Sequence, residues 1–358
     1  MSEHEPSSRR RLQIWMVVNG LILAVISGWL LKPSITDLPN PTATFSAKAS
    51  QAPATPPVPT MAEIMSWSGQ RFGLSTPDVP WSSVRFEELS GSAGARPTMI
   101  MNFTKWTEEF RPDVVTRSYE LGAIPIISWE PWAGIDKGTS QPAYALSKIE
   151  NGDFDPYITR FATAVRDAKW PVAIRFAHEM NGNWYPWSER RSGNEEGEYV
   201  RAWRHVHDIF TTVGATNTIW LWSPNILRPV PDVSLSPLYP GDMYVDWVGL
   251  VGYAVPERTA APVFEPTLTA LSTVTRKPIL ITETGVLPSS RAANWIKDFF
   301  QWLPKHPEVV GFVWFEYSKA EGGTQDWRFT ATPGSTNAFR AGITNLELAP
   351  APAGTRSG

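Results

Sequence analysis

Two glutamates end apolar, β-branched segments of the sequence, and their positions suggest chemistry. Residues 172–179 end in Glu179. Residues 278–283 end in Glu283. Cleavage of a glycosidic bond needs a protonated acid that gives its proton to the leaving oxygen and an ionised carboxylate that attacks or stabilises the sugar cation. A single glutamate at a strand end is most simply a salt bridge, but two on separate strands favour a glycosidase pair.

Other strand ends carry side chains suited to a flat, hydroxyl-rich ligand. The chain contains 18 Trp, 9 Tyr and 16 Phe, and sugar faces stack on such rings. Tyr253 ends a further segment, Trp314 lies near the end of another, and Glu130 follows a third, where we expect an exposed hydrogen-bond acceptor beside a sugar. The rings expected to pave a cleft open at both ends are Trp129, Trp132, Trp184, Trp187, Trp222 and Trp314.

Several other kinds of site are disfavoured. The sequence contains no cysteine, which excludes disulfides, thiolate metal sites and cysteine nucleophiles. The pair His178-Glu179 does not begin a zinc-protease motif, because Gly182 stands where a second histidine is needed. His205 and His207 are two residues apart on a predicted helix and so face different ways. We therefore expect no metal and no organic cofactor.

Eight short apolar segments are spaced along the chain with helix-length segments between most of them. Continuous apolar strands alternating with amphipathic helices indicate a parallel sheet covered by helices. Eight units within about 287 residues favour a (β/α)8 TIM barrel over a doubly wound sheet, because no glycine-rich phosphate loop follows the first strand. The predicted strands are 71–75, 98–103, 123–129, 172–179, 218–223, 246–253, 278–283 and 309–316.

Four segments between these strands show helix signals. Residues 155–169 begin with Asp-Pro, an N-cap followed by a proline at the first helical position. Residues 197–213 place apolar side chains at spacings of three and four, which forms one apolar stripe. Residues 266–275 and 289–303 show similar patterns. In a barrel built from such units, chemistry belongs at the carboxyl ends of the strands.

Composition limits the class of protein. Of the 358 residues, 42% are hydrophobic and 19% are charged, which suits a folded chain with a sizeable core. The net charge of −3 offers no basic surface for a phosphate backbone, so we expect no nucleic-acid partner.

The first 60 residues differ in character from the rest. Residues 12–31 form an uncharged stretch of 20 residues, enough to span a bilayer, and three arginines precede it. The positive-inside rule then places residues 1–11 in the cytoplasm and the rest outside the cytoplasm. A cleaved signal peptide is the alternative, but its apolar region should be shorter. The proline-rich residues 32–60 predict an extended linker. We expect residues 61–347 to form the catalytic barrel and residues 348–358 to form a disordered tail.

The chain resembles glycoside hydrolase family 26 over most of residues 61–335. The segment RFAHEMNGNW at 175–184 is similar almost residue for residue to the segment that carries the family's acid/base, and ITETG at 281–285 is similar to its nucleophile segment. The segments WSPN at 222–225, which ends in Asn225, and DWR at 326–328 also fit.

This resemblance implies roles for individual residues. Glu179 would be the acid/base and Glu283 the nucleophile, with Tyr253 hydrogen-bonded to the nucleophile. We expect Arg175 to donate to Glu283 as well. The negative charge of Glu283, together with partial burial, should raise the pKa of Glu179, and a bell-shaped dependence of rate on pH would follow. The sugar site would be lined by His178 and Trp314, and the leaving-group side by Trp184. One position departs from the family pattern: its mannanases usually have histidine where this chain has Glu130.

The expected protein is a membrane-anchored, retaining endo-β-glycosidase with an extracytoplasmic barrel. We expect its polysaccharide substrate to be β-1,4-mannan. The alternatives are a β-glucan or an exported polysaccharide, which the enzyme would trim beside an export system. The alternative from another class is a barrel that binds polysaccharide without cleaving it. An intact pair of carboxylates argues against that alternative.

Overall fold

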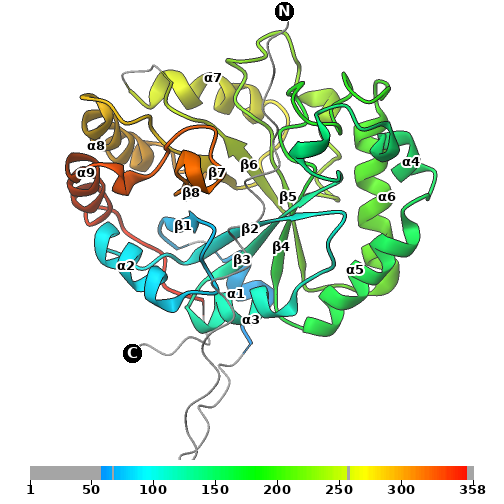
Figure 1. Ribbon diagram of the computed structural model, residues 1–358, viewed down its shortest axis with the longest axis horizontal. Coiled ribbons are helices and arrows are strands. Elements are labelled where there is room, and N and C mark those ends of the chain that lie inside the picture. Colours follow the sequence, from blue (N-terminus) through cyan, green and yellow to red (C-terminus); the bar gives the residue numbers. More distant parts are fainter. Residues whose placement is uncertain (1–57, 67, 256–258, 353–358) are drawn as a thin grey trace, which may run out of the picture. The chain divides into compact units, whose positions relative to one another are not determined.

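Eight parallel strands form a closed barrel with helices around it. The computed structural model describes residues 58–66, 68–255 and 259–352. Each strand pairs with the next in sequence, and the last pairs with the first, so the predicted TIM barrel is confirmed (Figure 1). The strands are β1 (Arg71–Ser75), β2 (Met99–Lys105), β3 (Ile124–Glu130), β4 (Val172–Phe176), β5 (Thr218–Trp222), β6 (Trp247–Val251), β7 (Ile279–Thr284) and β8 (Val309–Phe315).

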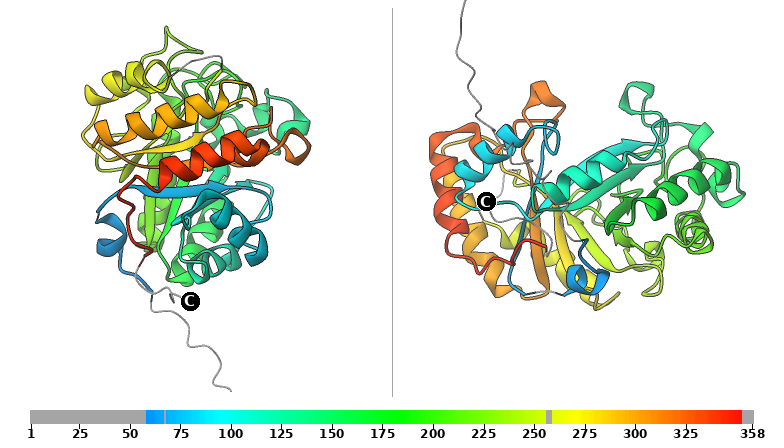
Figure 2. Two further views of the ribbon diagram at one scale, coloured as in Figure 1. Left: turned by 90° about the vertical axis from the view of Figure 1, so that its left-hand side faces the viewer. Right: turned by 90° about the horizontal axis from the view of Figure 1, so that it is seen from below.

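Helices cover the outside of the barrel, and Figure 2 shows α8 and α9 side by side on one flank. Their apolar stripes face the strands, so that rings from both layers interlock in one core. The described helices are α1 (Met61–Met65), α2 (Ser83–Ala93), α3 (Pro112–Glu120), α4 (Leu146–Glu150), α5 (Asp155–Ala168), α6 (Glu198–Val213), α7 (Ala261–Ser272), α8 (Ala292–Trp302) and α9 (Pro333–Ile343).

Two predicted boundaries differ from the structure for local reasons. β4 ends at Phe176, not at Glu179, because Ala177 and Glu179 adopt left-handed backbone conformations with φ of 44° and 54°. α7 begins at Ala261, five residues before the predicted start at Pro266, and Pro266 lies inside the helix. A proline is favoured in the first turn, and it is Pro262 that occupies that turn.

Side chains alternate between the barrel interior and the helix layer along each strand. In β3, Ser128 and Glu130 point inward, as their contacts with Arg175 and with the cleft show. Trp129 between them packs on Phe161 of α5, with ring centroids 4.3 Å apart. This alternation decides which rings can meet a ligand.

The ends of the described chain are tied to the barrel. Thr60 caps α1 through a capping box with Glu63. Leu348 and Ala349, expected to begin the disordered tail, lie beside Gln70, whose backbone oxygen accepts from the Ala349 nitrogen at 2.8 Å. The expected membrane anchor at residues 12–31 and the linker as far as residue 57 lie outside the described residues. Within the described residues, no helix combines the length and hydropathy needed to cross a bilayer.

Candidate active site

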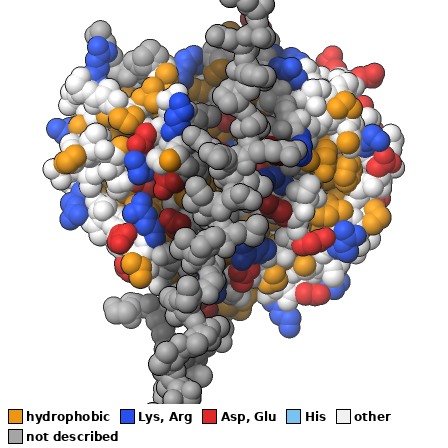
Figure 3. Space-filling view, in the orientation of Figure 1, with side chains coloured by type: hydrophobic (Ala, Val, Ile, Leu, Met, Phe, Trp, Pro, Cys, Tyr) orange, Lys and Arg blue, Asp and Glu red, His pale blue; other side chains and the backbone are white. Residues whose placement is uncertain are grey.

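A cleft of about 900 Å³ opens at the carboxyl ends of the strands. Figure 3 shows this face with acidic and basic side chains interspersed around its visible parts, not gathered by sign. Seven residues predicted for the site line the cleft: Glu130, Trp132, Glu179, Trp184, Asn225, Tyr253 and Glu283.

Glu179 lies just beyond β4, where the left-handed turn aims its side chain across the cleft. Its backbone nitrogen donates to the Ser223 oxygen at 2.7 Å, which ties the turn to the end of β5. Asn225 donates to its Oε1 at 2.9 Å, and the Trp184 indole donates to its Oε2. Burial and the charge of Glu283 raise the pKa of Glu179 to about 7. The side chain can therefore both hold and release a proton near neutral pH.

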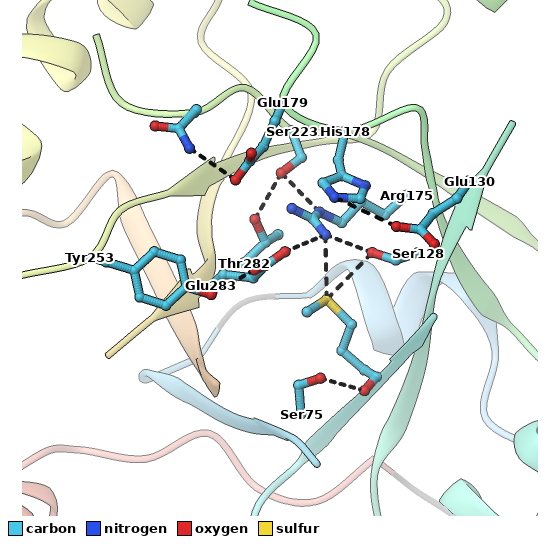
Figure 4. A network of polar contacts seen from close by, with 12 residues as sticks. Ser75, Ser128, Glu130, Arg175, His178, Glu179, Ser223, Tyr253, Thr282 and Glu283 are labelled. Carbon is cyan, nitrogen blue, oxygen red and sulfur yellow. Dashed lines mark hydrogen bonds and ion pairs between the residues drawn. The ribbon is translucent and has the colours of Figure 1, made fainter. Parts of the chain in front are cut away.

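Glu283 lies on β7 and meets a different set of partners. The Arg175 guanidinium lies 2.7 Å from Oε1, and the Tyr253 hydroxyl donates to Oε2 at 2.7 Å. The expected donation by Tyr253 is confirmed, and Arg175 forms an ion pair with Glu283 (Figure 4). One oxygen of Glu283 thus faces a cation and the other a hydroxyl donor, so the carboxyl group is held in a fixed position in the cleft.

Arg175 is the structural centre of the polar network. Its guanidinium is completely buried and donates to Ser128 on β3 at 2.6 Å and to Ser223 at 3.0 Å. Ser223 also contacts Thr282 of β7 at 2.8 Å. One side chain therefore joins β3, β4, β7 and the end of β5 below the cleft (Figure 4). Such a network holds Glu283 in place before any ligand arrives.

Glu130 and His178 form a buried pair at the base of the cleft. The expectation that Glu130 is exposed is wrong, because its side chain is 6% accessible and accepts from the Trp132 indole at 3.0 Å. Burial is the main cause that raises its pKa to about 8. His178 Nε2 lies 4.0 Å from Glu130 Oε1. Burial and the charge of Arg175 lower the pKa of His178 well below its usual value, so the imidazole is neutral.

The expectation that six tryptophans pave the cleft is wrong for four of them. These four rings face the helix layer or the interior of a loop, and each is completely buried. Trp314, for example, packs on Phe339 of α9 at 5.1 Å and donates to the Trp327 oxygen. His178 does not line the cleft surface either. The four rings away from the cleft are Trp129, Trp187, Trp222 and Trp314.

Other rings, which the residue analysis did not select, take their place in the cleft. Trp327 packs on Tyr253 with centroids 4.4 Å apart, and Phe315 follows Trp314 on the inward side of β8. Strand alternation would have selected Phe103 and Phe315, and Trp327 lies in the DWR segment, whereas Tyr185 and Tyr317 carry no comparable signal. The cleft-lining rings that were missed are Phe103, Tyr185, Phe315, Tyr317 and Trp327.

Asn181 is a further residue that sequence reasoning did not single out. Its side chain is 1% accessible and forms hydrogen bonds with the backbone of Asn225, the residue that donates to Glu179. Among the described residues, no group of three or more His, Asp or Glu side chains could hold a metal ion.

Comparison with known proteins agrees with this geometry. The family model described as glycosyl hydrolase family 26 matches residues 138–310, which contain both Glu179 and Glu283. Endoglucanase H of Acetivibrio thermocellus is 32% identical over 77% of this chain and 30% of its own length. The mannan endo-1,4-beta-mannosidase of Bacillus subtilis is 26% identical over 47% of this chain and 46% of its own length. The chain thus spans less than half the length of either relative.

Solved structures support the fold. The catalytic domain of an endo-beta-1,4-mannanase from Bacillus sp. JAMB-750 superposes with a TM-score of 0.60 at 19% identity, covering 80% of this chain and 91% of that one. A parallel eight-stranded barrel with glutamates beyond β4 and on β7 defines the class of barrel glycosidases. Within that class, the chain belongs to glycosyl hydrolase family 26, a family of retaining enzymes.

Proposed function

We propose that the chain is a retaining endo-β-glycosidase in which Glu283 is the nucleophile and Glu179 the acid/base. The contrast between their surroundings carries this proposal. Glu179 is held by two neutral donors and has its pKa raised to about 7, whereas Glu283 contacts a buried guanidinium and a phenol. Two carboxyl groups in one cleft with opposite environments match the division of labour in retaining hydrolysis.

The reaction would proceed in two displacements. In the first, Glu283 forms a bond to the anomeric carbon while the glycosidic bond breaks, and Glu179 gives its proton to the leaving oxygen. In the second, ionised Glu179 takes a proton from water. The water oxygen bonds to the anomeric carbon as the ester to Glu283 breaks, which regenerates both groups with net retention.

We propose a β-glucan as the preferred substrate and β-1,4-mannan as the second candidate. The sequence alone had favoured mannan slightly. The named endoglucanase aligns with 77% of this chain and the named mannosidase with 47%, which supports the reverse order. Glu130 also stands where mannanases of the family usually have histidine. Glucose and mannose differ in one hydroxyl direction, and a site that bonds a hydroxyl in one direction disfavours the other.

Reducing-end release from a panel of β-glucans, β-mannans and β-xylans tests the activity. The wild-type chain should act on at least one of them with retention at the anomeric carbon, followed by proton NMR. Glu283→Ala should remove turnover, and Glu179→Gln should lower it strongly and leave binding. Binding of a glycan without turnover by the wild-type chain would instead support the non-catalytic barrel.

Glu130→His tests the substrate order directly. The variant should shift the ratio of mannan to glucan turnover toward mannan. An unchanged ratio would show that Glu130 does not select the sugar.

We further propose that residues 12–31 anchor the chain in a membrane with the barrel outside the cytoplasm. The uncharged stretch and the arginines before it support this location. An enzyme held there is placed to trim a polysaccharide as it leaves an export system. Detergent-phase partitioning of the full chain, compared with a chain lacking residues 1–57, tests the anchor. Equal partitioning of the two would contradict it.

A further inference from the structure

Each carboxyl oxygen of Glu179 accepts a hydrogen bond from a different side chain. Asn225 donates to Oε1 at 2.9 Å, and Trp184 donates to Oε2. These donors come from the end of β5 and from the loop after β4. Both donors must be held in place, because a carboxyl group that rotates about its last bond no longer points its proton at the leaving oxygen. The residues that hold the donors are neighbours in sequence, Asn181 and Gly182.

Asn181 fixes Asn225 through both ends of its amide. Its Nδ2 donates to the Asn225 backbone oxygen at 2.8 Å, and its Oδ1 accepts from the Asn225 backbone nitrogen at 2.8 Å. The backbone of Asn225 is therefore clamped on both sides, and its side chain is left to donate to Glu179. The Asn181 side chain is 1% accessible, so water does not compete for these bonds.

Gly182 fixes Trp184 by its lack of a side chain. A Cβ added at Gly182 would overlap the six-membered ring of the Trp184 indole. The Trp184 indole thus occupies the space that a side chain at residue 182 would fill, and from there its N–H reaches Glu179. The Gly182 backbone is itself held. Its nitrogen donates to the backbone oxygen of Glu179 at 2.9 Å, and its oxygen accepts from the Ser188 hydroxyl at 2.6 Å.

Resting on the proposed function, we propose that Asn181 and Gly182 are positioning residues that orient the acid/base Glu179, one through Asn225 and the other through Trp184. Both donors are neutral and both favour the ionised carboxylate. Loss of either should therefore raise the pKa of Glu179 further and release the group from its orientation. Asn181→Ala removes the first donor's support without touching substrate.

The kinetic test compares two leaving groups. With a polysaccharide, kcat/KM should fall roughly 10- to 100-fold in Asn181→Ala, the range expected when a catalytic group is misplaced. With a dinitrophenyl glycoside, whose leaving group departs without a proton, kcat/KM should fall less than about threefold because acid assistance is not needed. This difference isolates protonation from binding and folding.

Asn102→Ala is the matched control. Asn102 is also buried, and its Nδ2 donates to the Val79 backbone oxygen at 2.8 Å. This hydrogen bond involves none of Glu179, Asn225, Gly182 and Ser188. Its loss should affect thermal stability and change kcat/KM for the two substrates by the same factor.

A titration independent of activity gives the second test. Isotope-labelled glutamate carboxyl carbons are followed by NMR across pH, and the Glu179 signal is assigned by its absence in Glu179→Gln. Asn181→Ala and Gly182→Ala should each raise the pKa of Glu179, and Asn102→Ala should leave that pKa unchanged.

The outcomes separate this inference from the proposed function. Equal losses on both substrates in Asn181→Ala, with an unmoved Glu179 titration, would overturn the positioning role. A wild-type chain inactive on every glycan would overturn the proposed function, while the titration would still decide whether Asn181 and Gly182 control Glu179.

Discussion

Glu130 is a carboxyl group that burial keeps protonated near neutral pH. Its pKa is raised to about 8, mainly because few water molecules reach it, although the Trp132 indole and the charge of Arg175 act in the opposite direction. A protonated carboxyl can donate a hydrogen bond to a sugar hydroxyl as well as accept one. The histidine expected at this position in mannanases of the family also offers a donor, so a protonated Glu130 shares that capacity.

The buried state of Glu130 predicts a pH dependence of stability. Its pKa is near 4.5 unfolded and about 8 folded, so the folded state binds more protons between these values and stability falls as pH rises. Glu130→Gln removes this pH-dependent contribution to the free energy of unfolding. Its Tm relative to wild type should be higher at pH 8 than at pH 5 by at least about 2 °C, the shift that roughly 1 kcal/mol produces. Scanning calorimetry at both pH values measures it, with Glu120→Gln at an exposed position as control.

The raised pKa of Glu179 predicts how the rate falls on the alkaline side of the pH profile. Proton donation needs the protonated form, so kcat/KM on a polysaccharide should decline as pH rises through about 7. Glu179→Gln should lower kcat/KM by roughly 10²- to 10⁴-fold and remove this alkaline limb. A variant that kept both limbs would show that another group is the acid.

At the scale of strands and helices, periodicity predicted the barrel well but placed its rings poorly. Each predicted strand overlaps a strand of the structure, because buried parallel strands leave a clear apolar signal. Three of the wrong tryptophans, Trp129, Trp222 and Trp314, share one error: their proximity to a strand end was used without the alternation of sides. Ser128 faces inward, so Trp129 must face the helices, and Trp314 and Phe315 divide in the same way.

The turn beyond β4 could not be predicted in the same manner. Ala177 and Glu179 both have positive φ, a conformation rare in residues other than glycine, and nothing in their types announces it. The family resemblance located Glu179 correctly in the cleft, whereas its hydrogen bonds depend on Asn225 and on contacts that only the folded chain brings together.

The two kinds of tryptophan should respond differently to truncation. Trp129→Ala should lower the free energy of unfolding by about 3–5 kcal/mol, as for other large buried rings, while glycan affinity per folded molecule stays unchanged. Trp184 is half-buried in the cleft, so Trp184→Ala should cost less stability and weaken glycan binding. Denaturant unfolding and calorimetric titration distinguish them. Loss of affinity in Trp129→Ala would place that ring in the site after all.

At the scale of the whole molecule, the walls of the cleft come from both halves of the chain. Lys105 ends β2 and Asp136 follows β3, whereas Glu321 and Trp327 lie after β8. Because β8 pairs with β1, the cleft is complete only when the barrel has closed. Activity should therefore report on the integrity of the entire barrel.

Deletion of residues 1–57 should leave a folded and active barrel. The barrel strands begin at Arg71, and the Thr60 capping box that starts α1 is retained in the shortened chain. Circular dichroism and reducing-end release should match those of the full chain in detergent. An insoluble or inactive shortened chain would show that the fold extends further toward the N-terminus.

The buried contact between Arg175 and Glu283 determines how a substrate complex is best captured in a crystal. Glu283→Gln inactivates the enzyme but strands a guanidinium that is completely buried, and breaking such a pair costs about 3–5 kcal/mol. Glu179→Gln gives up one hydrogen bond and no ion pair. For soaking with intact oligosaccharides, the acid/base variant is therefore the one whose cleft should keep its native shape.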